Sequence, residues 1–274
     1  MGRRVKVIAH RGARSIAPEN TLAAARKALE VGADLWETDV AVTADEELIL
    51  FHDDSLKRTT NVEEVFPDRA PWTFTTFKLR EIRSLDAGSW FIDEDPFGQV
   101  AAGAVSPEEA ESYRGEKVPT LEEALEFTRD AGWTVNLELK RLPHPMEDFP
   151  VVRRVLELIR RVGIPLEEVV ISSFVHRWLR EVHALEPRIE IQALIGYFTS
   201  KPIDWRYVGE FHTYNSRDLL TPPEKVHELV EKGEEINIFT VNDVEEARKY
   251  IEAGVSGLFT DFPQRIVRVC HAED

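Results

Sequence analysis

The sequence predicts an α/β fold of the (β/α)8 TIM-barrel class, with residues 1–274 forming a single domain. Strand-like segments alternate with helices of about ten residues, a pattern typical of βα units around a parallel sheet. A closed barrel of this class takes about 250 residues, which is close to the whole chain. Eight strands are expected, at 5–9, 34–39, 133–139, 168–172, 189–194, 210–214, 235–240 and 256–260.

Five glycines mark the expected helix ends, because each stands between an apolar-striped segment and a strand, where a left-handed residue is favoured. They are Gly32, Gly132, Gly163, Gly233 and Gly254. Capping-box spacing indicates helix starts at Thr120 with Glu123, Thr221 with Glu224, and Asn242 with Glu245. Asn20 is interpreted as a further N-cap.

Residues 40–51 depart from this alternation, because two strand-like pieces are joined by only about four residues. A parallel crossover needs about a dozen residues or more. The segment must therefore fold back as an antiparallel hairpin that extends from strand two. We expect its turn to be centred on Ala44 and Asp45, which pairs residue 40 with residue 49.

Residues 53–117 form an excursion before the next expected helix, and they are rich in Thr, Asp, Pro and aromatic residues. The stretch KLREIRSL has helical periodicity, and Ser106 followed by Pro107 begins another helix. No sharp change of composition marks a second domain. We therefore interpret this region as a small inserted lid over one face of the barrel.

Acidic residues outnumber basic ones, 50 to 34, which gives a net charge of −16. Such a surface repels nucleic acid and anionic membranes over long range, so neither is expected as a partner. A phosphate-bearing small molecule would have to meet a local cationic patch. Clustered arginine, lysine or metal ligands are therefore the features to look for.

We expect negligible binding of DNA or RNA at physiological salt, because the chain has no basic stripe. Fluorescence anisotropy with a labelled oligonucleotide measures this directly. A micromolar complex that weakens as salt is added would contradict the expectation.

Cys270 is the only cysteine, which excludes an internal disulfide and a zinc site built from several cysteines. No segment approaches the roughly 18 apolar residues of a membrane-spanning helix, and the beginning of the chain has no long apolar run. A cytoplasmic protein without stable membrane insertion is therefore the expectation.

Strand one ends in His10, Arg11 and Gly12, and the active sites of βα barrels lie at such carboxyl ends. A histidine there can act as an acid or a base near neutral pH. The adjacent arginine can hold a phosphate by two parallel hydrogen bonds. Taken alone, the tripeptide could equally be a surface pair on a loop, so its interpretation depends on the neighbouring strand ends.

Carboxylates at two further strand ends form a candidate metal site. Glu37 and Asp39 are two residues apart, so both point to the same face of strand two. Glu138, near the end of strand three, is a third possible ligand. Like charges held close together need a cation or a proton, and Mg²⁺ or Ca²⁺ suits oxygen ligands. The alternative is that the strand-two pair lines an outward polar face.

Other residues at the strand ends complete the candidate site. The hairpin would return His52 to a position beside Glu37, as a second candidate acid–base group. Lys140 shares a strand face with Glu138 and could neutralise phosphate charge, although a simple Glu–Lys surface pair is the alternative. Three further residues could support the site or line a substrate pocket: Glu19, Phe174 and Phe239.

Together these segments resemble the glycerophosphodiester phosphodiesterase family, over nearly the whole chain. The matching stretches are AHRGA at 9–13, PENT at 18–21, WETDV at 36–40, FHDDSLKRTT at 51–60, VPTLEEAL at 118–125, NLELK at 136–140, ISSF at 171–174, FTVN at 239–242 and GLFTDFP at 257–263. Each stretch alone is short, but their order and spacing make the match specific.

The resemblance implies metal-dependent hydrolysis of a glycerophosphodiester to sn-glycerol 3-phosphate and an alcohol. It implies one Mg²⁺ or Ca²⁺ ion held by carboxylates, two histidines as general acid and base, and two cationic side chains on the phosphate. In this sequence the metal ligands would be Glu37, Asp39 and Glu138, the acid–base pair His10 and His52, and the phosphate-binding residues Arg11 and Lys140.

Two departures from the family pattern are visible. The hairpin turn, often Asp-Gly in the family, reads Asp45-Glu46 here, and a tryptophan common before T-V-N is Phe239. The first departure concerns the shape of a loop. The second concerns the wall of the pocket and therefore the choice of substrate.

Two alternatives remain open. One is another activity on the same barrel, such as a lysophospholipase D or a phosphoinositide-type lyase, which would use the same histidines and acids. The other is a non-catalytic phosphate-binding barrel, which should have lost a catalytic histidine or a metal carboxylate. All of these residues are present, which favours an enzyme.

Overall fold

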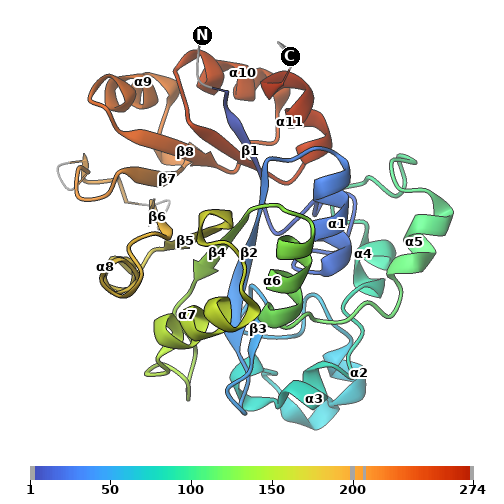
Figure 1. The fold of residues 1–274 in the computed structure, drawn as a ribbon. Helices are drawn as coiled ribbons and strands as arrows, with labels where there is room; N and C mark the ends of the chain where they lie inside the picture. The colour runs from blue at the N-terminus through green and yellow to red at the C-terminus, as the bar shows by residue number, and fades with distance from the viewer. Residues whose placement is uncertain (1–3, 198–200, 206–207, 272–274) are drawn as a thin grey trace.

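The computed structural model describes residues 4–197, 201–205 and 208–271. Within these ranges, nine strands form one sheet (Figure 1). They are β1 (Lys6–Ala9), β2 (Leu35–Val42), β3 (Leu48–Leu50), β4 (Val135–Leu139), β5 (Val169–Ser173), β6 (Glu190–Ile195), β7 (Thr213–Arg217), β8 (Glu235–Phe239) and β9 (Gly257–Thr260). All except β3 are parallel, and β1 pairs with both β9 and β2, so the eight parallel strands close on themselves. The predicted (β/α)8 barrel is confirmed.

Helices cover the outside of the barrel (Figure 1). They are α1 (Leu22–Glu30), α6 (Leu121–Asp130), α7 (Val151–Val162), α8 (His176–Leu185), α9 (Pro223–Glu231), α10 (Val244–Glu252) and α11 (Pro263–Cys270). Their apolar faces and the outer face of the sheet form the main core, where Trp36 stacks on Trp133. The five predicted glycines all have positive φ angles, as Gly163 does at the end of α7. None of the helices in the described residues is long and apolar enough to cross a bilayer.

The insertion between β3 and α6 carries four short helices: α2 (Val62–Val65), α3 (Leu79–Ile82), α4 (Ser89–Glu94) and α5 (Pro107–Tyr113). Figure 1 shows them on one side of the barrel. The backbone N–H of Ala44 in the hairpin donates to the carbonyl of Phe77, and Lys27 of α1 forms an ion pair with Glu109 of α5. The insertion is therefore attached to the hairpin and to the first helix of the barrel.

The hairpin after β2 is confirmed, but its register differs by one residue from the prediction. Val40 pairs with Leu50 and not with residue 49. The backbone N–H of Thr43 donates to the carbonyl of Glu47, so three residues lie in the loop, where a two-residue turn was expected. The extra residue shifts the pairing along the whole return strand.

Glu46 explains how this longer loop closes. Its φ angle of 64° lies in the left-handed region, which a non-glycine residue seldom adopts. A three-residue hairpin loop commonly needs one left-handed residue after its turn. The Asp45-Glu46 turn is therefore accommodated by the backbone conformation of Glu46, and its effect is confined to the hairpin loop.

The capping box of Thr120 and Glu123 is confirmed at the start of α6. The other three predicted N-caps are each one residue early. The true N-caps are Thr21 rather than Asn20, Pro222 rather than Thr221, and Asp243 rather than Asn242. The displaced side chains are hydrogen-bonded elsewhere, to Asp39, Ser216 and Asp261 respectively. A side chain bound in this way is not available to cap a helix.

β7 begins at Thr213, later than the predicted residue 210. The hydroxyl of Tyr214 accepts hydrogen bonds from the backbone N–H groups of Gly209 and Phe211. These bonds hold the preceding segment in a turn, so that it does not pair with a neighbouring strand. The strand consequently reads Thr-Tyr-Asn-Ser-Arg.

A small apolar cluster lies inside the barrel below its mouth. It consists of Ile8, Leu35, Val170 and Phe259, with Phe239 packed against it. Because side chains alternate along a strand, the residues two positions further along β1, β2 and β9 also point inward. These residues are His10, Glu37 and Asp261, so the strand alternation places polar groups directly above an apolar floor.

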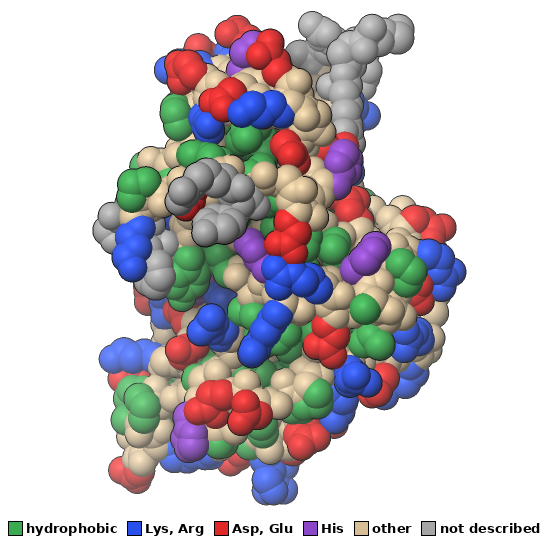
Figure 2. All heavy atoms as spheres, turned by 90° about the vertical axis from the view of Figure 1, so that its left-hand side faces the viewer, with side chains coloured by type: hydrophobic (Ala, Val, Ile, Leu, Met, Phe, Trp, Pro, Cys, Tyr) green, Lys and Arg blue, Asp and Glu red, His purple; other side chains and the backbone are tan. Residues whose placement is uncertain are grey.

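Figure 2 shows one face of the molecule. Acidic, basic and histidine side chains are interspersed on it, with hydrophobic side chains between them. This face therefore carries no continuous stripe of a single charge.

Candidate active site

Three carboxylates from two neighbouring strands meet at the mouth of the barrel. Glu37 and Asp39 lie on β2, and Glu138 lies on β4 at the position that pairs with Asp39. Each offers an oxygen atom within 4.8 Å of the other two. Within the described part of the chain, no other group of three or more potential metal ligands is this close. The structure thus brings together the three residues that the sequence proposed as metal ligands.

Crowding shifts the pKa values of these carboxyl groups in opposite directions. Burial, together with repulsion from Asp39, raises the pKa values of Glu37 and Glu138 above the ordinary range. Burial would also raise the pKa of Asp39, but the positive charges of Lys140 and Arg11 outweigh this effect and lower it. The cluster therefore holds one readily ionised carboxyl group and two that resist ionisation.

This donor set fits a hard divalent cation. Mg²⁺ and Ca²⁺ prefer carboxylate oxygens, and a cation among the three groups would relieve the repulsion that raises two of the pKa values. The group contains no histidine or cysteine, the ligands that softer transition metals favour.

Arg11 ties the loop after β1 to the cluster. Its backbone N–H donates to Glu37 Oε2 at 3.0 Å. Its guanidinium lies 2.9 Å from Glu19 Oε1 and 3.4 Å from Asp39 Oδ2. Burial would lower the pKa of Arg11, but the carboxylates of Asp39 and Glu19 outweigh it and raise the value, so the side chain stays charged. Its φ of 57° is unusual for a non-glycine residue, a kind of strain that clusters at functional sites.

Gly12 is required by packing within the protein. Its φ is 81°, and a Cβ atom at this position would lie 2.6 Å from the backbone carbonyl carbon of Ala24 in α1. The glycine thus allows the loop that carries His10 and Arg11 to lie directly against the first helix.

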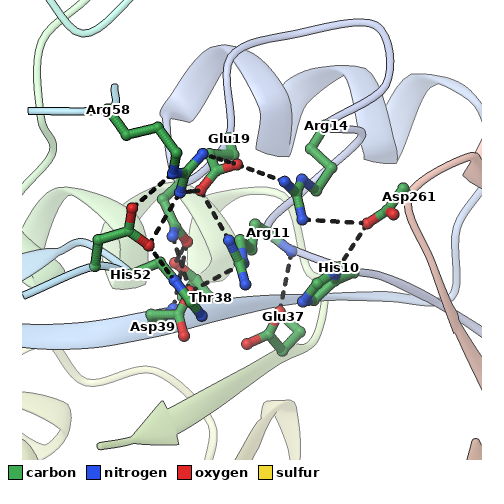
Figure 3. Close-up of polar contacts among 12 residues, drawn as sticks. His10, Arg11, Arg14, Glu19, Glu37, Thr38, Asp39, His52, Arg58 and Asp261 are labelled. Carbon is green, nitrogen blue, oxygen red and sulfur yellow. Dashed lines mark hydrogen bonds and ion pairs between the residues drawn. The ribbon is translucent and has the colours of Figure 1, made fainter. Parts of the chain in front are cut away.

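Lys140 connects the carboxylates to the segment after β3. Its ammonium group lies 3.4 Å from Asp39 Oδ1 and donates to the carbonyl oxygen of His52 at 3.0 Å. His52 Nδ1 lies 2.6 Å from Asp53 Oδ1. Figure 3 shows His52 beside Asp39, whereas the prediction placed it beside Glu37. The shifted hairpin register places residue 52 opposite Thr38, one position further along β2 than predicted.

His10 lies on the other side of the cluster (Figure 3). Its Nδ1 atom lies 2.7 Å from Asp261 Oδ1. Burial and the positive charge of Arg11 lower the pKa of His10 to about 4, against the opposing effect of Asp261. His10 is therefore neutral at pH 7, with one ring nitrogen bound to a carboxylate.

Three arginines surround the buried carboxylate of Glu19. Its oxygens lie 2.9 Å from Arg11, 2.7 Å from Arg14 and 2.6 Å from Arg58. Burial would raise the pKa of Glu19, but Arg11 and Arg58 outweigh it and lower the value to about 2. Because Arg58 comes from the insertion, Glu19 joins the insertion to the loop after β1.

Glu19→Gln is expected to reduce the free energy of unfolding by about 3 kcal/mol at pH 7, the usual scale for removing one partner of a buried ion pair. The Glu19 side chain is only 3% exposed, so solvent screens the pair little. Because its pKa is lowered to about 2, the stabilisation is complete above the unfolded pKa of about 4.3 and is lost as the pH falls toward 2.

Urea unfolding of the native chain and the E19Q variant at pH 7 and pH 3.5 measures both effects. The difference between the two proteins should be smaller at pH 3.5 by about 1 kcal/mol. Equal stabilities at pH 7, or a difference that grows on acidification, would show that Glu19 is not the anionic centre of the arginine group.

Four charged residues of this region are not among the site residues predicted from the sequence: Arg14, Asp53, Arg58 and Asp261. Three of them lie in the stretches at 51–60 and 257–263 that resemble the family. Their place in a matching motif is the sequence feature that could have identified them as site residues. Arg14 lies outside these matching stretches, so no such feature indicated a role for it. Arg58 and Asp261 have partners far away in the sequence, Glu19 and His10, which only the folded barrel brings near.

Phe174 and Phe239 meet at the ends of β5 and β8. Their ring centroids are 6.2 Å apart, and Tyr197 lies 5.0 Å from Phe174. Phe239 also contacts Phe259 of the inner apolar cluster, and the guanidinium of Arg217 lies over its ring at 5.1 Å. Phe239 is half-buried, so it belongs partly to the core and partly to the mouth.

The chain matches the model of the glycerophosphoryl diester phosphodiesterase family over residues 10–265. It belongs to this family. The chain is therefore a phosphodiesterase that hydrolyses glycerophosphodiesters. The matched region begins at His10 and includes all three carboxylates of the cluster, so the barrel mouth lies within it.

Members of the phosphodiesterase family resemble the chain over nearly its full length. A glycerophosphodiester phosphodiesterase from Caldanaerobacter subterraneus is 32% identical over 266 residues, which cover 96% of each protein. A solved phosphodiesterase from Oleispira antarctica, in complex with the product sn-glycerol-3-phosphate, is 28% identical with a TM-score of 0.78, covering 97% of this chain and 96% of that one. A glycerophosphodiester phosphodiesterase from Agrobacterium tumefaciens has a TM-score of 0.70 at 27% identity, covering 97% and 100%.

Proposed function

We propose that this phosphodiesterase releases sn-glycerol 3-phosphate and an alcohol by a reaction that uses one bound Mg²⁺ or Ca²⁺ and two histidines. The observation that carries the proposal is the convergence of three carboxylates within 4.8 Å, with His10 near Glu37 and His52 near Asp39 (Figure 3). The Oleispira relative, which was solved with sn-glycerol-3-phosphate, supports the proposed product.

Glu37, Asp39 and Glu138 would hold the metal. A bound divalent cation polarises a phosphate oxygen and makes a nearby hydroxyl group easier to deprotonate. Hydrogen bonds to the ligands support this role, because they orient the oxygens in advance. Asn20 donates to Asp39 Oδ2 at 2.9 Å, and the backbone N–H of Arg11 donates to Glu37.

Arg11 and Lys140 would bind the phosphate. Both side chains lie 3.4 Å from Asp39, so a phosphate beside the cluster would meet two fixed positive charges. Charges held in place before the reaction stabilise a developing negative charge without reorganisation. On a chain with a net charge of −16, these local cations also offset the general repulsion of an anionic substrate.

His10 and His52 would transfer the protons. Each binds an aspartate through Nδ1, which leaves Nε2 for the substrate. One histidine would remove the proton from the nucleophile, which is water or the glycerol 2-hydroxyl group. The other would protonate the leaving alkoxide. Positions on opposite sides of the cluster suit attack and departure on opposite sides of the phosphorus atom.

We further propose that the whole chain acts as one domain, with residues 53–117 as an inserted lid. Arg58 supports this arrangement, because it reaches from the insertion to Glu19 and Asp53 at the site. A cytoplasmic location is also proposed, since the lone Cys270 favours a reducing compartment.

A lysophospholipase D-like activity is the second candidate. Phe174, Phe239 and the exposed Tyr197 form an aromatic wall that could accept an acyl chain. A panel of glycerophosphocholine, glycerophosphoethanolamine, glycerophosphoinositol and a lysophospholipid, each with Mg²⁺ and with Ca²⁺, tests both candidates. Release of glycerol 3-phosphate from the deacylated diesters supports the first. Preference for the lysophospholipid supports the second, and no turnover of any substrate contradicts both.

A further inference from the structure

Asp261 is a buried carboxylate to which the proposed reaction assigns no role. It follows β9, which pairs with β1, so closure of the barrel places its Oδ1 atom 2.7 Å from His10 Nδ1. Burial would raise the pKa of Asp261, but the hydrogen bond from His10 and the charge of Arg14 outweigh it and lower the value. The carboxyl group is therefore ionised, and an ionised carboxylate can only accept hydrogen bonds.

Asn242 fixes the orientation of this carboxylate. Its amide oxygen accepts a hydrogen bond from the backbone N–H of Asp261 at 2.8 Å, which identifies the oxygen end of the amide. Its amide nitrogen then donates to Asp261 Oδ2, also at 2.8 Å. Asp261 thus turns Oδ2 to Asn242 and Oδ1 to His10.

We propose that Asp261, held by Asn242, is a positioning residue that fixes the tautomer of His10. Because Oδ1 only accepts, His10 Nδ1 must carry the hydrogen, and Nε2 is left with a free lone pair. Within the described residues, Nε2 forms no hydrogen bond, and Figure 3 shows the ring between Asp261 and Glu37. The inference rests on the proposed acid–base role of His10, since Nε2 is the atom that would exchange the proton.

Asp261→Asn tests this arrangement, because Asn242 decides which way the new amide turns. The donor of Asn242 requires an oxygen at the Oδ2 position, so the new NH₂ group must face His10. That group donates to Nδ1 and moves the ring hydrogen to Nε2, which gives the wrong tautomer. In the double variant D261N/N242D, the carboxylate at position 242 accepts from the new NH₂ group and turns the amide oxygen back toward His10.

In the metal-loaded enzyme, D261N is expected to lower kcat by about 10²-fold or more with little change in KM, the usual scale for losing an acid–base group. The D261N/N242D variant should recover at least about tenfold. Asp243→Asn is the matched control, because it makes the same change next to Asn242 and keeps an N-cap on α10. It should behave as the native enzyme.

Nitrogen NMR of the His10 ring reports the tautomer separately from activity, in metal-free protein as well. We expect the hydrogen on Nδ1 in the native chain and in D261N/N242D, and on Nε2 in D261N. A hydrogen that stays on Nδ1 in D261N, or a double variant no more active than D261N, would overturn the positioning role. An inverted tautomer with native kcat would instead remove His10 from the reaction, and the error would lie in the proposed function.

Discussion

EDTA treatment is expected to abolish hydrolysis of glycerophosphodiesters, and added Mg²⁺ or Ca²⁺ is expected to restore it. Without a cation, the three carboxylates of the mouth stand within 4.8 Å of one another and repel an anionic substrate. With a cation bound, the same point attracts the phosphate. Initial rates after chelation, and during titration with each metal, measure the effect. Full activity in metal-stripped protein would show that the three carboxylates do not hold a metal that the reaction needs.

Glu138→Gln separates loss of metal binding from loss of the fold. The variant keeps the shape of the side chain but removes one ligand charge, so activity should fall sharply and the thermal shift on adding metal should shrink. Burial and repulsion from Asp39 raise the pKa of Glu138, so its ionised form is destabilising as the pH rises above the unfolded value. Metal-free E138Q should therefore be more stable than the metal-free native chain above pH 7, by on the order of 1–2 kcal/mol.

Glu126→Gln is the matched control for this experiment. Glu126 lies on the exposed side of α6, and its loss should change neither activity nor stability. If metal-free E138Q instead unfolds more readily than the native chain, Glu138 acts as a structural anchor and not as one of three repelling ligands.

His10→Ala and His52→Ala are each expected to lower kcat by about 10²-fold or more while the chain stays folded. The two side chains are 19% and 32% exposed, and neither belongs to the apolar core. Their carboxylate partners keep other contacts, because Asp261 retains Asn242 and Asp53 retains Arg58. Product release and thermal unfolding measure the two effects separately.

His144→Ala is the control, because this side chain is 86% exposed and belongs to no group at the site. A catalytic variant that fails to fold would point to a structural role for that histidine. A substrate with a nitrophenol leaving group distinguishes the acid from the base. Nitrophenolate leaves without a proton, so the variant of the general acid should recover much of its rate on this substrate, whereas the variant of the base should not.

The sequence could predict the barrel because local patterns carry most of that information. Alternating strands and helices, glycine ends and the short 43–46 link each constrain the chain over a few residues. The carboxylate cluster was predictable for a related reason. Residues two apart on a strand share a face, so Glu37 and Asp39 had to converge once β2 faced inward. Glu138 followed because β4 repeats this pattern beside β2.

The predictions that were wrong concern residues whose side chains suit two different local roles. In these cases a partner distant in the sequence determines which role the side chain takes. Asn20 and Asn242 both suit an N-cap, yet they bind Asp39 and Asp261. The hairpin register had a similar ambiguity, because two-residue and three-residue loops are both compatible with the pattern. The left-handed backbone of Glu46 allows the longer loop, which moves residue 52 from opposite Glu37 to opposite Thr38.

The barrel, the inward-facing acids and the strand-end histidines follow from local patterns, because short-range periodicity sets the direction of each side chain. The contacts that hold these groups in place depend on the closed fold. Asp261 reaches His10 across 251 positions because β9 closes on β1, and Arg58 reaches Glu19 because the insertion packs against the barrel. Hydrogen bonds and ion pairs act over a few ångströms, so the partners of a buried charge depend on the closed fold and not on distance along the chain.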